Sequence, residues 1–328
     1  MSCALMGRSV SVFALIGAAL VSAQISDWQQ KYDQGISALN EGRNADGRAI
    51  LQAAYDAAQS LDDRVRARAA GGLASAFLQE GHLEEAERYY NEARAILEPS
   101  GGPAIQLAIV WTGLGEIFLD RLRLDEGEKA LRRAMSLLKD TPQVHPCALL
   151  CRRHFAELLF LRGDYAAAET LLKELVADAR KSGSPMLGIT LSVLGRTYIM
   201  QKRLADAEPA IKESMDLQRQ SGEQSPAYAD ILVLMAGEYR LEGRMERAAP
   251  LVRKALKIYE DFHDPRAVFA YRELAMEAAT EGKYLMARGH IEKALDIARK
   301  ASMPERVTET LEQDLSGVPP VVASSRRK

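Results

Sequence analysis

Residues 72–97 read GLASAFLQEGHLEEAERYYNEARAIL, two amphipathic stretches on either side of Gly81. Apolar and small residues recur at helical spacing before this glycine, over Leu73–Phe77, and again after it, over Ala86–Ala93. Such spacing places them on one face of a helix that must be buried against another element. The stretch therefore predicts a hairpin of two antiparallel helices that closes at Gly81.

The same pattern returns six more times, with turns 39 to 41 residues apart. A fixed period of this size is the signature of a repeat array. Five turn residues are glycine, which favours the left-handed conformation at a helix end. We expect the other two turns, at Leu122 and Lys202, to close differently. The turn residues are Gly42, Gly81, Leu122, Gly163, Lys202, Gly243 and Gly282.

Two positions in every copy hold only glycine or alanine, one seven residues before the turn and one five residues after it. Small residues at both positions allow the two helices of a hairpin to approach closely. The residue nine after each turn is large and apolar, so we expect it to fill the core. These residues are Leu51, Tyr90, Leu131, Leu172, Ile211, Val252 and Ile291.

Prolines support the register, because each lies 22 or 24 residues after a turn, where the next hairpin should begin. Proline is tolerated in the first turn of a helix. The last one, Pro304, opens a solitary helix over 304–315 that we expect to cap the array. We expect residues 316–328, with adjacent prolines and a basic end, to be disordered. The prolines are Pro103, Pro146, Pro185, Pro226, Pro265 and Pro304.

Residues 1–23 have a different character. Arg8 precedes an apolar run over 10–21, and Val21-Ser22-Ala23 has the small residues of a signal-peptidase site. The run is shorter than the ~20 residues of a membrane span. We therefore expect a cleaved signal peptide and an exported bacterial protein, periplasmic or secreted, with no membrane insertion after cleavage. An uncleaved anchor is the alternative.

The positions described above match the small and bulky positions of a known repeat, most fully in the third copy, with Trp111, Leu114, Gly115 and Phe118. The chain resembles the tetratricopeptide repeat (TPR) family over residues 28 to about 300, in the subgroup with longer units. The resemblance implies an all-α, right-handed superhelical solenoid of antiparallel hairpins, with seven hairpins in 24–303.

The sequence offers little catalytic chemistry. It lacks a glycine-rich phosphate loop, a nucleophile elbow and a zinc-protease motif, so we expect no enzyme, no catalytic residue and no cofactor. A net charge of −2 does not favour a nucleic-acid partner. Cys147, Cys151 and His154 share one predicted helix face and are weak candidates for a metal or redox site. The alternative is that they are core residues.

The TPR resemblance also implies a groove, lined by the first helix of each hairpin, that binds a protein or peptide segment. Arginines at these positions form a basic strip that attracts an acidic or phosphorylated segment, or else each is neutralised by a neighbouring carboxylate. The predicted groove residues are Tyr32, Glu116, Arg153, Glu157, Arg196, Arg240 and Arg272.

Two functional hypotheses follow. The first is an exported, non-enzymatic scaffold that binds a protein or peptide partner in this groove. The second is a structural accessory subunit, or spacer, of an envelope complex that is held by its outer faces. Exposed apolar area on the groove favours the first, and exposed apolar area on the outer faces or edges favours the second.

Overall fold

A computed structural model describes residues 25–221, 226–301 and 303–319, and the regular secondary structure in these ranges is helical throughout. The chain divides into two compact units, Met1–Arg162 (unit 1) and Gly163–Lys328 (unit 2). The helices of unit 1 are one over residues 25–40, α2 (Asn44–Ala58), α3 (Asp63–Gln79), α4 (Leu83–Leu97), α5 (Ala104–Asp120), α6 (Leu124–Leu137) and α7 (Pro146–Leu161). Those of unit 2 are α8 (Tyr165–Ser182), α9 (Leu187–Met200), α10 (Leu204–Ser221), α11 (Pro226–Leu241), α12 (Met245–Asp261), α13 (Ala267–Thr280), α14 (Tyr284–Lys300) and α15 (Glu305–Gly317).

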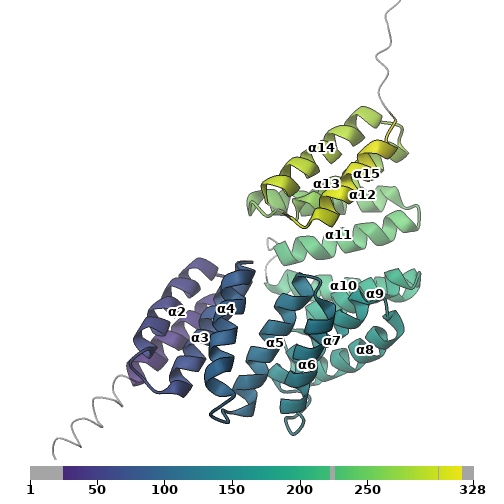
Figure 1. Ribbon diagram of the computed structural model, residues 1–328. Helices are drawn as coiled ribbons and strands as arrows, with labels where there is room; N and C mark the ends of the chain where they lie inside the picture. The colour runs from purple at the N-terminus through teal and green to yellow at the C-terminus, as the bar shows by residue number, and fades with distance from the viewer. Residues whose placement is uncertain (1–24, 222–225, 302, 320–328) are drawn as a thin grey trace, which may run out of the picture. The chain divides into compact units, whose positions relative to one another are not determined.

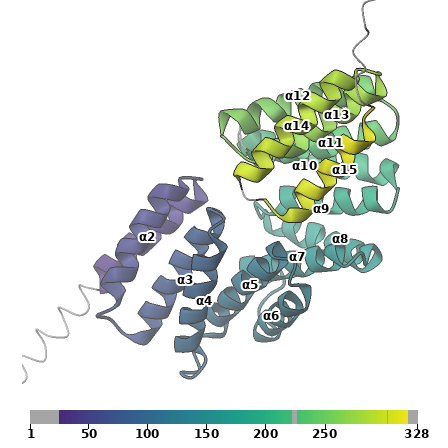
Figure 2. The same cartoon turned by 45° about the horizontal axis from the view of Figure 1, so that its top comes forward.

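Within each unit the helices pack as successive antiparallel pairs (Figures 1 and 2). In unit 1 helix α3 pairs with α4 and α5 with α6, and in unit 2 the pairs are α9 with α10, α11 with α12, and α13 with α14. The first helices of neighbouring pairs also touch, as α3 touches α5 and α5 touches α7. The first helices of a unit therefore lie side by side and form one common face, which carries the predicted groove positions. We call it the inner face.

The small positions are sites of close approach, as predicted. A Cβ atom built on Gly115 would lie 2.7 Å from Leu131 Cδ2, and one on Gly195 would lie 2.5 Å from Ile211 Cγ1. The large apolar residues nine after each turn are at most 3% exposed. A larger residue at the small positions would force these core side chains out of place.

The prediction that the turns at Leu122 and Lys202 close differently is wrong. Both residues adopt left-handed backbone conformations, with φ of 56° and 60°, as the glycines at the other turns do. Arg123 N–H donates to Phe118 O at 2.7 Å, just as His82 N–H donates to Phe77 O across the turn at Gly81. The paired backbone hydrogen bonds of this helix-ending motif outweigh the steric cost of a Cβ atom in the left-handed region.

The prolines lie at helix starts, as the register requires. Pro146 and Pro226 are the first residues of α7 and α11, and Pro304 precedes α15. Helix α15 packs on α14 and buries Leu311. It ends at Gly317, two residues later than expected, and Val318 is only 8% exposed, so the ordered structure extends past residue 315.

The predicted signal peptide, residues 1–23, and most of the tail expected to be disordered, residues 320–328, lie outside the described residues. Among the helices that are described, none is both long enough and apolar enough to cross a membrane.

Candidate functional site

A cavity of about 300 Å³ opens on the inner face of unit 1. Its walls come from three consecutive first helices, namely the helix over residues 25–40, α3 and α5, together with the end of α4. Its volume lies at the lower end of the range for small-molecule pockets, so it suits one or two side chains of a partner. The lining residues are Tyr32, Asp33, Ile36, Ala67, Arg68, Gly71, Gly72, Ser75, Leu97, Gln106, Ile109 and Val110.

Tyr32, a predicted groove residue, forms one wall of this cavity and is held from three sides. Its ring stacks on Trp28 with 5.3 Å between centroids, and the Arg68 guanidinium lies 4.6 Å from its centroid. Gly72 provides the room, because a Cβ atom there would lie 2.5 Å from Tyr32 Cε2. Burial raises the pKa of Tyr32, so this ring presents a neutral surface to the cavity. Its position is fixed before any ligand arrives, which lowers the entropic cost of binding.

Polar contacts continue from the cavity toward α7. Ser75, which lines the cavity, shares a hydrogen bond of 2.8 Å with Tyr90. Glu116 follows on α5, and its Oε2 atom lies 3.2 Å from Nε2 of the buried His154. Burial opposes ionisation of Glu116, but His154 and Arg153 outweigh it and hold the pKa of this carboxyl below its ordinary value. Glu116 is therefore an ionised carboxylate at neutral pH.

The side chains of Arg153 and Glu157 complete this group. Arg153 lies 3.3 Å from Glu157 Oε2, and its Nη2 atom lies 2.8 Å from His154 Nε2. Arg153 and His154 are the more buried members of this group, at 11% and 2% exposed. The carboxylates Glu116 and Glu157 are 34% and 32% exposed. This part of the inner face therefore presents negative charge to solvent.

Asp120 adds a third carboxylate at the end of α5. The residue is exposed and, among the described residues, makes no ion pair. Loss of solvent around it raises the pKa of Asp120 to about 6, and repulsion from Glu116 and Glu157 adds to the shift, while Arg153 opposes it. We call Glu116, Asp120 and Glu157 the acidic cluster.

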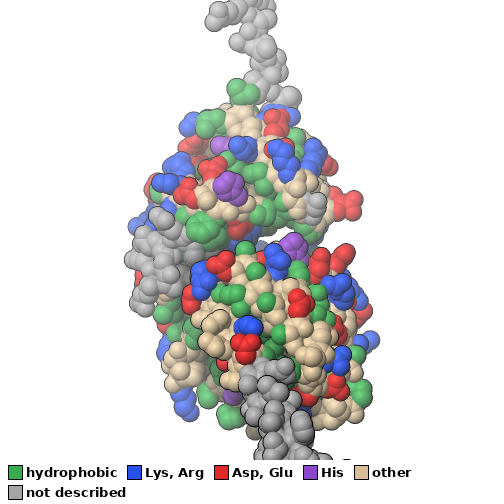
Figure 3. All heavy atoms as spheres, turned by 90° about the vertical axis from the view of Figure 1, so that its left-hand side faces the viewer, with side chains coloured by type: hydrophobic (Ala, Val, Ile, Leu, Met, Phe, Trp, Pro, Cys, Tyr) green, Lys and Arg blue, Asp and Glu red, His purple; other side chains and the backbone are tan. Residues whose placement is uncertain are grey.

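The predicted groove residues of unit 2 do not stand as an unpaired basic strip. Arg240 pairs with Glu273 on α13 at 2.7 Å, and Arg272 pairs with Asp314 on α15 at 2.5 Å. Arg196 also has an interaction partner. The pairs of Arg153, Arg240 and Arg272 favour the alternative in which the arginines are neutralised by neighbouring carboxylates. The face in Figure 3 likewise shows basic and acidic side chains interspersed.

The cysteines do not share a site with His154. Cys151 is fully buried and its thiol donates to Leu131 O at 3.6 Å, and burial raises its pKa to about 11. Burial also raises the pKa of Cys147. Both are free thiols. Metal binding needs thiolates, which this environment disfavours, and the described residues contain no group of three His, Cys, Asp or Glu side chains placed to hold a metal ion.

Sequence reasoning missed Ile109 and Asp120 on the inner face. Ile109 lies thirteen residues before the turn residue Leu122, one helical turn ahead of the expected groove positions, and is 41% exposed in the cavity wall. Ile189 and Phe269 occupy the same register in unit 2 and are 43% and 42% exposed. Extending the predicted groove positions by one helical turn toward the start of each first helix would have identified Ile109, Ile189 and Phe269.

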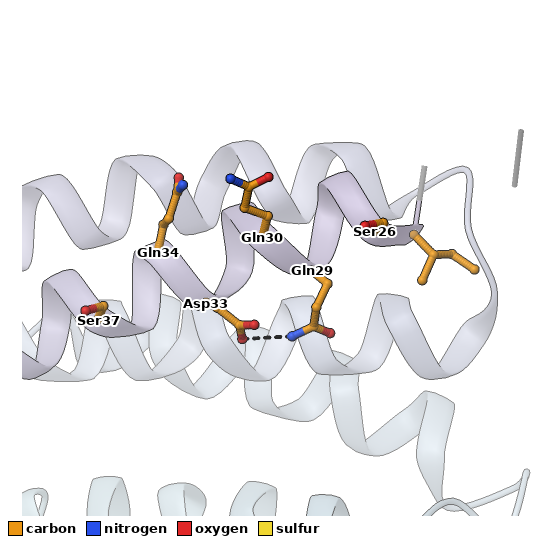
Figure 4. A pocket seen from close by; sticks show the side chains of 7 residues that line it. Ser26, Gln29, Gln30, Asp33, Gln34 and Ser37 are labelled. Atoms are coloured by element: carbon orange, nitrogen blue, oxygen red, sulfur yellow. Dashed lines mark hydrogen bonds between the residues drawn. The ribbon is translucent and has the colours of Figure 1, made fainter. Parts of the chain in front are cut away.

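A second hollow, shown in Figure 4, is lined by a single helix, the one over residues 25–40. Its side chains are mostly polar, and Gln29 Nε2 donates to Asp33 Oδ1 at 2.8 Å. Because side chains from one helix satisfy one another there, we regard this hollow as a solvated helix surface and not as a built site.

Stacked antiparallel hairpins of this kind define an α-solenoid repeat protein. Two family models, both described as tetratricopeptide repeat, match residues 32–100 and 186–261. Together with the fold, these matches support a TPR protein.

Two solved structures have similar folds. RapI in its apo form has a TM-score of 0.65 at 14% identity, over 84% of this chain and 99% of that chain. The apo quorum sensor NprR from B. thuringiensis has a TM-score of 0.64 at 15% identity, over 88% of this chain and 80% of that chain. At these identities the likeness shows the fold alone.

A sequence relative is the protein KINESIN LIGHT CHAIN-RELATED 2 of Arabidopsis thaliana, 22% identical over 195 residues. The match covers 58% of this chain but only 29% of the relative. A similar match, at 23% identity over 191 residues, is to KINESIN LIGHT CHAIN-RELATED 3 of the same plant. The chain thus corresponds to less than a third of the length of these relatives.

Proposed function

We propose that this protein is an exported, non-enzymatic scaffold that binds a protein or peptide segment on the inner face of unit 1. The TPR fold suggests a protein–protein interaction scaffold. The observation that carries the proposal is the cavity in which Tyr32, Ile36 and the exposed Ile109 meet, because exposed apolar side chains around a preformed hollow are typical of a binding surface.

Export rests on the residues before position 24. If the signal peptide is cleaved after Ala23, the mature protein begins at Gln24. N-terminal sequencing of the protein recovered from a fractionated bacterial host tests this directly. A mature chain that begins at Gln24 in the periplasm or medium supports export, and an intact Met1 in the cytoplasm contradicts it.

Gly71 offers a way to block the cavity without disturbing the fold. It lies in α3 and lines the cavity, and a Cβ atom built on it meets no atom of the described residues within 4 Å. Gly71→Leu should therefore fill the cavity, and it should raise helix stability by up to about 1 kcal/mol. Gly289 in α14 is an exposed helical glycine that also has open space around its Cβ position, so Gly289→Leu is the matched control.

The functional test is affinity capture from an envelope extract with the parent and both variants. We expect Gly71→Leu to lose partners that the parent and Gly289→Leu retain, with unchanged circular dichroism spectra. Retention of every partner by Gly71→Leu would place the interface elsewhere on the protein.

One observation favours the second candidate, a spacer held by its outer faces. Tyr284, Leu285 and Met286 begin α14, a second helix, and are 40%, 72% and 55% exposed. Three consecutive exposed apolar residues are unusual on a solvated helix. If a Leu285→Lys, Met286→Lys variant loses the captured partners and Gly71→Leu keeps them, the spacer hypothesis replaces the groove hypothesis.

A further inference from the structure

We propose that the inner face of unit 1 binds a segment that carries an apolar side chain and, about three residues away, a lysine or arginine. This inference rests on the proposed function above and names the chemistry of the partner. The apolar side chain occupies the cavity, and the basic side chain meets the acidic cluster of Glu116, Asp120 and Glu157.

The cavity accounts for the apolar part of the ligand. Ile36, Leu97, Ile109 and Val110 line it, and the Tyr32 ring closes one side. Ile109 is 41% exposed, so an apolar side chain of the partner would remove this isoleucine from water. Burial of apolar surface on both partners provides the favourable free energy of such a contact.

Gln106 also lines the cavity, and its buried Oε1 atom has no hydrogen-bond partner among the described residues. A buried acceptor without a partner costs free energy. A rotation of the Gln106 amide toward the cavity would let a peptide N–H or a basic side chain of the partner donate to it.

Charge decides between a basic and an acidic partner. The acidic cluster has three carboxylates, and the cation that neutralises it, Arg153, is 11% exposed and already bound to Glu157 and His154. What meets solvent is carboxylate, including Asp120, which makes no ion pair within the described part of the chain. An incoming cation would offset the repulsion among these groups, whereas an acidic or phosphorylated segment would increase it.

The two parts of the site are continuous. Ser75 in the cavity wall shares a hydrogen bond with Tyr90, and burial together with the charge of Glu116 raises the pKa of Tyr90, so Glu116 lies near that ring. Glu116 in turn contacts His154 on α7. The cavity reaches Ile109 on α5, and Glu116 of the acidic cluster follows seven residues later on the same helix, roughly 10 Å along its axis at about 1.5 Å per residue. An extended chain covers that distance in about three residues, at roughly 3.3 Å each.

The test uses three pools of fluorescent nine-residue peptides. Each pool has Leu at the fourth position and Lys, Gln or Glu at the seventh, with Ser, Ala and Gly mixed elsewhere. Fluorescence anisotropy measures binding to the parent protein, to Gly71→Leu, and to the double variant Asp120→Asn, Glu157→Gln. The charge-matched control is Asp56→Asn, Glu84→Gln, which removes two exposed carboxylates from α2 and α4.

We expect the Lys pool to bind the parent about tenfold more tightly than the Glu pool, with a preference that shrinks at high salt. The double variant should lose this preference, and the control variant should keep it. Gly71→Leu should weaken the binding of all pools.

Two results would overturn the inference alone. If the Glu pool binds the parent as tightly as the Lys pool, or if the double variant keeps the preference, the acidic cluster does not recognise the ligand. In either case, loss of binding in Gly71→Leu would leave the proposed function standing. If no pool binds the folded parent, or if Gly71→Leu binds every pool as the parent does, the proposed function fails together with the inference.

Discussion

Replacing Glu238 with glutamine should stabilise unit 2 at neutral and higher pH. Glu238 lies on α11 and is fully buried, and among the residues that the structure describes neither of its carboxylate oxygens has a hydrogen-bond partner. The nearby cations are already engaged, because Lys212 on α10 pairs with Glu208 and Arg244 pairs with Glu242. A buried carboxylate without a partner is costly when it is charged.

The magnitude follows from the pKa of this group. Burial first, and then repulsion from Glu242, raise the pKa of Glu238 from its ordinary value of 4.5 to about 7, although Lys212 and Arg244 oppose the shift. In the unfolded chain the Glu238 carboxyl has its ordinary pKa of 4.5, so between pH 4.5 and about pH 7 the folded state binds more protons than the unfolded state. Glu238 is therefore protonated and costs no stability below about pH 4. The free energy of unfolding falls as the pH rises, and the full penalty is reached above pH 7. The full loss is about 3 kcal/mol.

Urea denaturation followed by circular dichroism at pH 4, 6 and 8 measures the effect. We expect Glu238→Gln to raise the free energy of unfolding by about 3 kcal/mol at pH 8 and by almost nothing at pH 4. The matched control is Glu277→Gln, at the same position of the next hairpin, where the carboxylate lies 3.7 Å from Arg253 and should give no such gain. A gain that is equal at pH 4 and pH 8, or no gain at all, would refute the reasoning.

Three further predictions concern the hairpins and the site wall. Leu122→Gly and Lys202→Gly should each raise the free energy of unfolding by about 1 kcal/mol, because a residue with a Cβ atom is strained in the left-handed backbone conformation and glycine is not. Lower unfolding midpoints in urea would contradict this. Ala207→Leu should cost roughly 1 to 3 kcal/mol because Ala207 is fully buried at a helix crossing, and a circular dichroism melt that matches the parent would show that the register is wrong. Gly72→Ala should displace the Tyr32 ring and weaken binding of the Lys peptide pool, and unchanged tyrosine resonances in NMR spectra would contradict it.

Much of the fold could be predicted because it is local and repeated. The period of about 40 residues, the small residues at fixed distances from each turn and the prolines at helix starts all constrain the same helical hairpin. Each hairpin contacts mainly its neighbours, so a pattern read from one copy applies to the next. The failure at Leu122 and Lys202 has a physical cause. Sequence preference reports the strain of one residue, whereas the paired backbone hydrogen bonds of the turn decide its conformation.

The charge of the candidate site could not be predicted in this way. The sequence predicted Glu116, Arg153 and Glu157 on the inner face, and the arginines at these positions suggested either a basic strip or arginines neutralised by carboxylates. Only packing decided that Arg153 lies beneath the carboxylates, bound to His154, and that Asp120 joins them from the end of α5.

For Glu238, too, the sequence could indicate burial but not the lack of a charged partner. Its place in the repeat register, five residues before Gly243, matches buried positions such as Ala76, Ile117 and Leu158, so the sequence alone could have indicated burial. The absence of a partner could not have been read from it, because Lys212 lies on another helix and is held by Glu208. The sequence alone determined the repeat register and the large apolar residues that fill the core of each hairpin. Tertiary structure decided which charges are paired, since pairing depends on distances between side chains that are far apart in the chain.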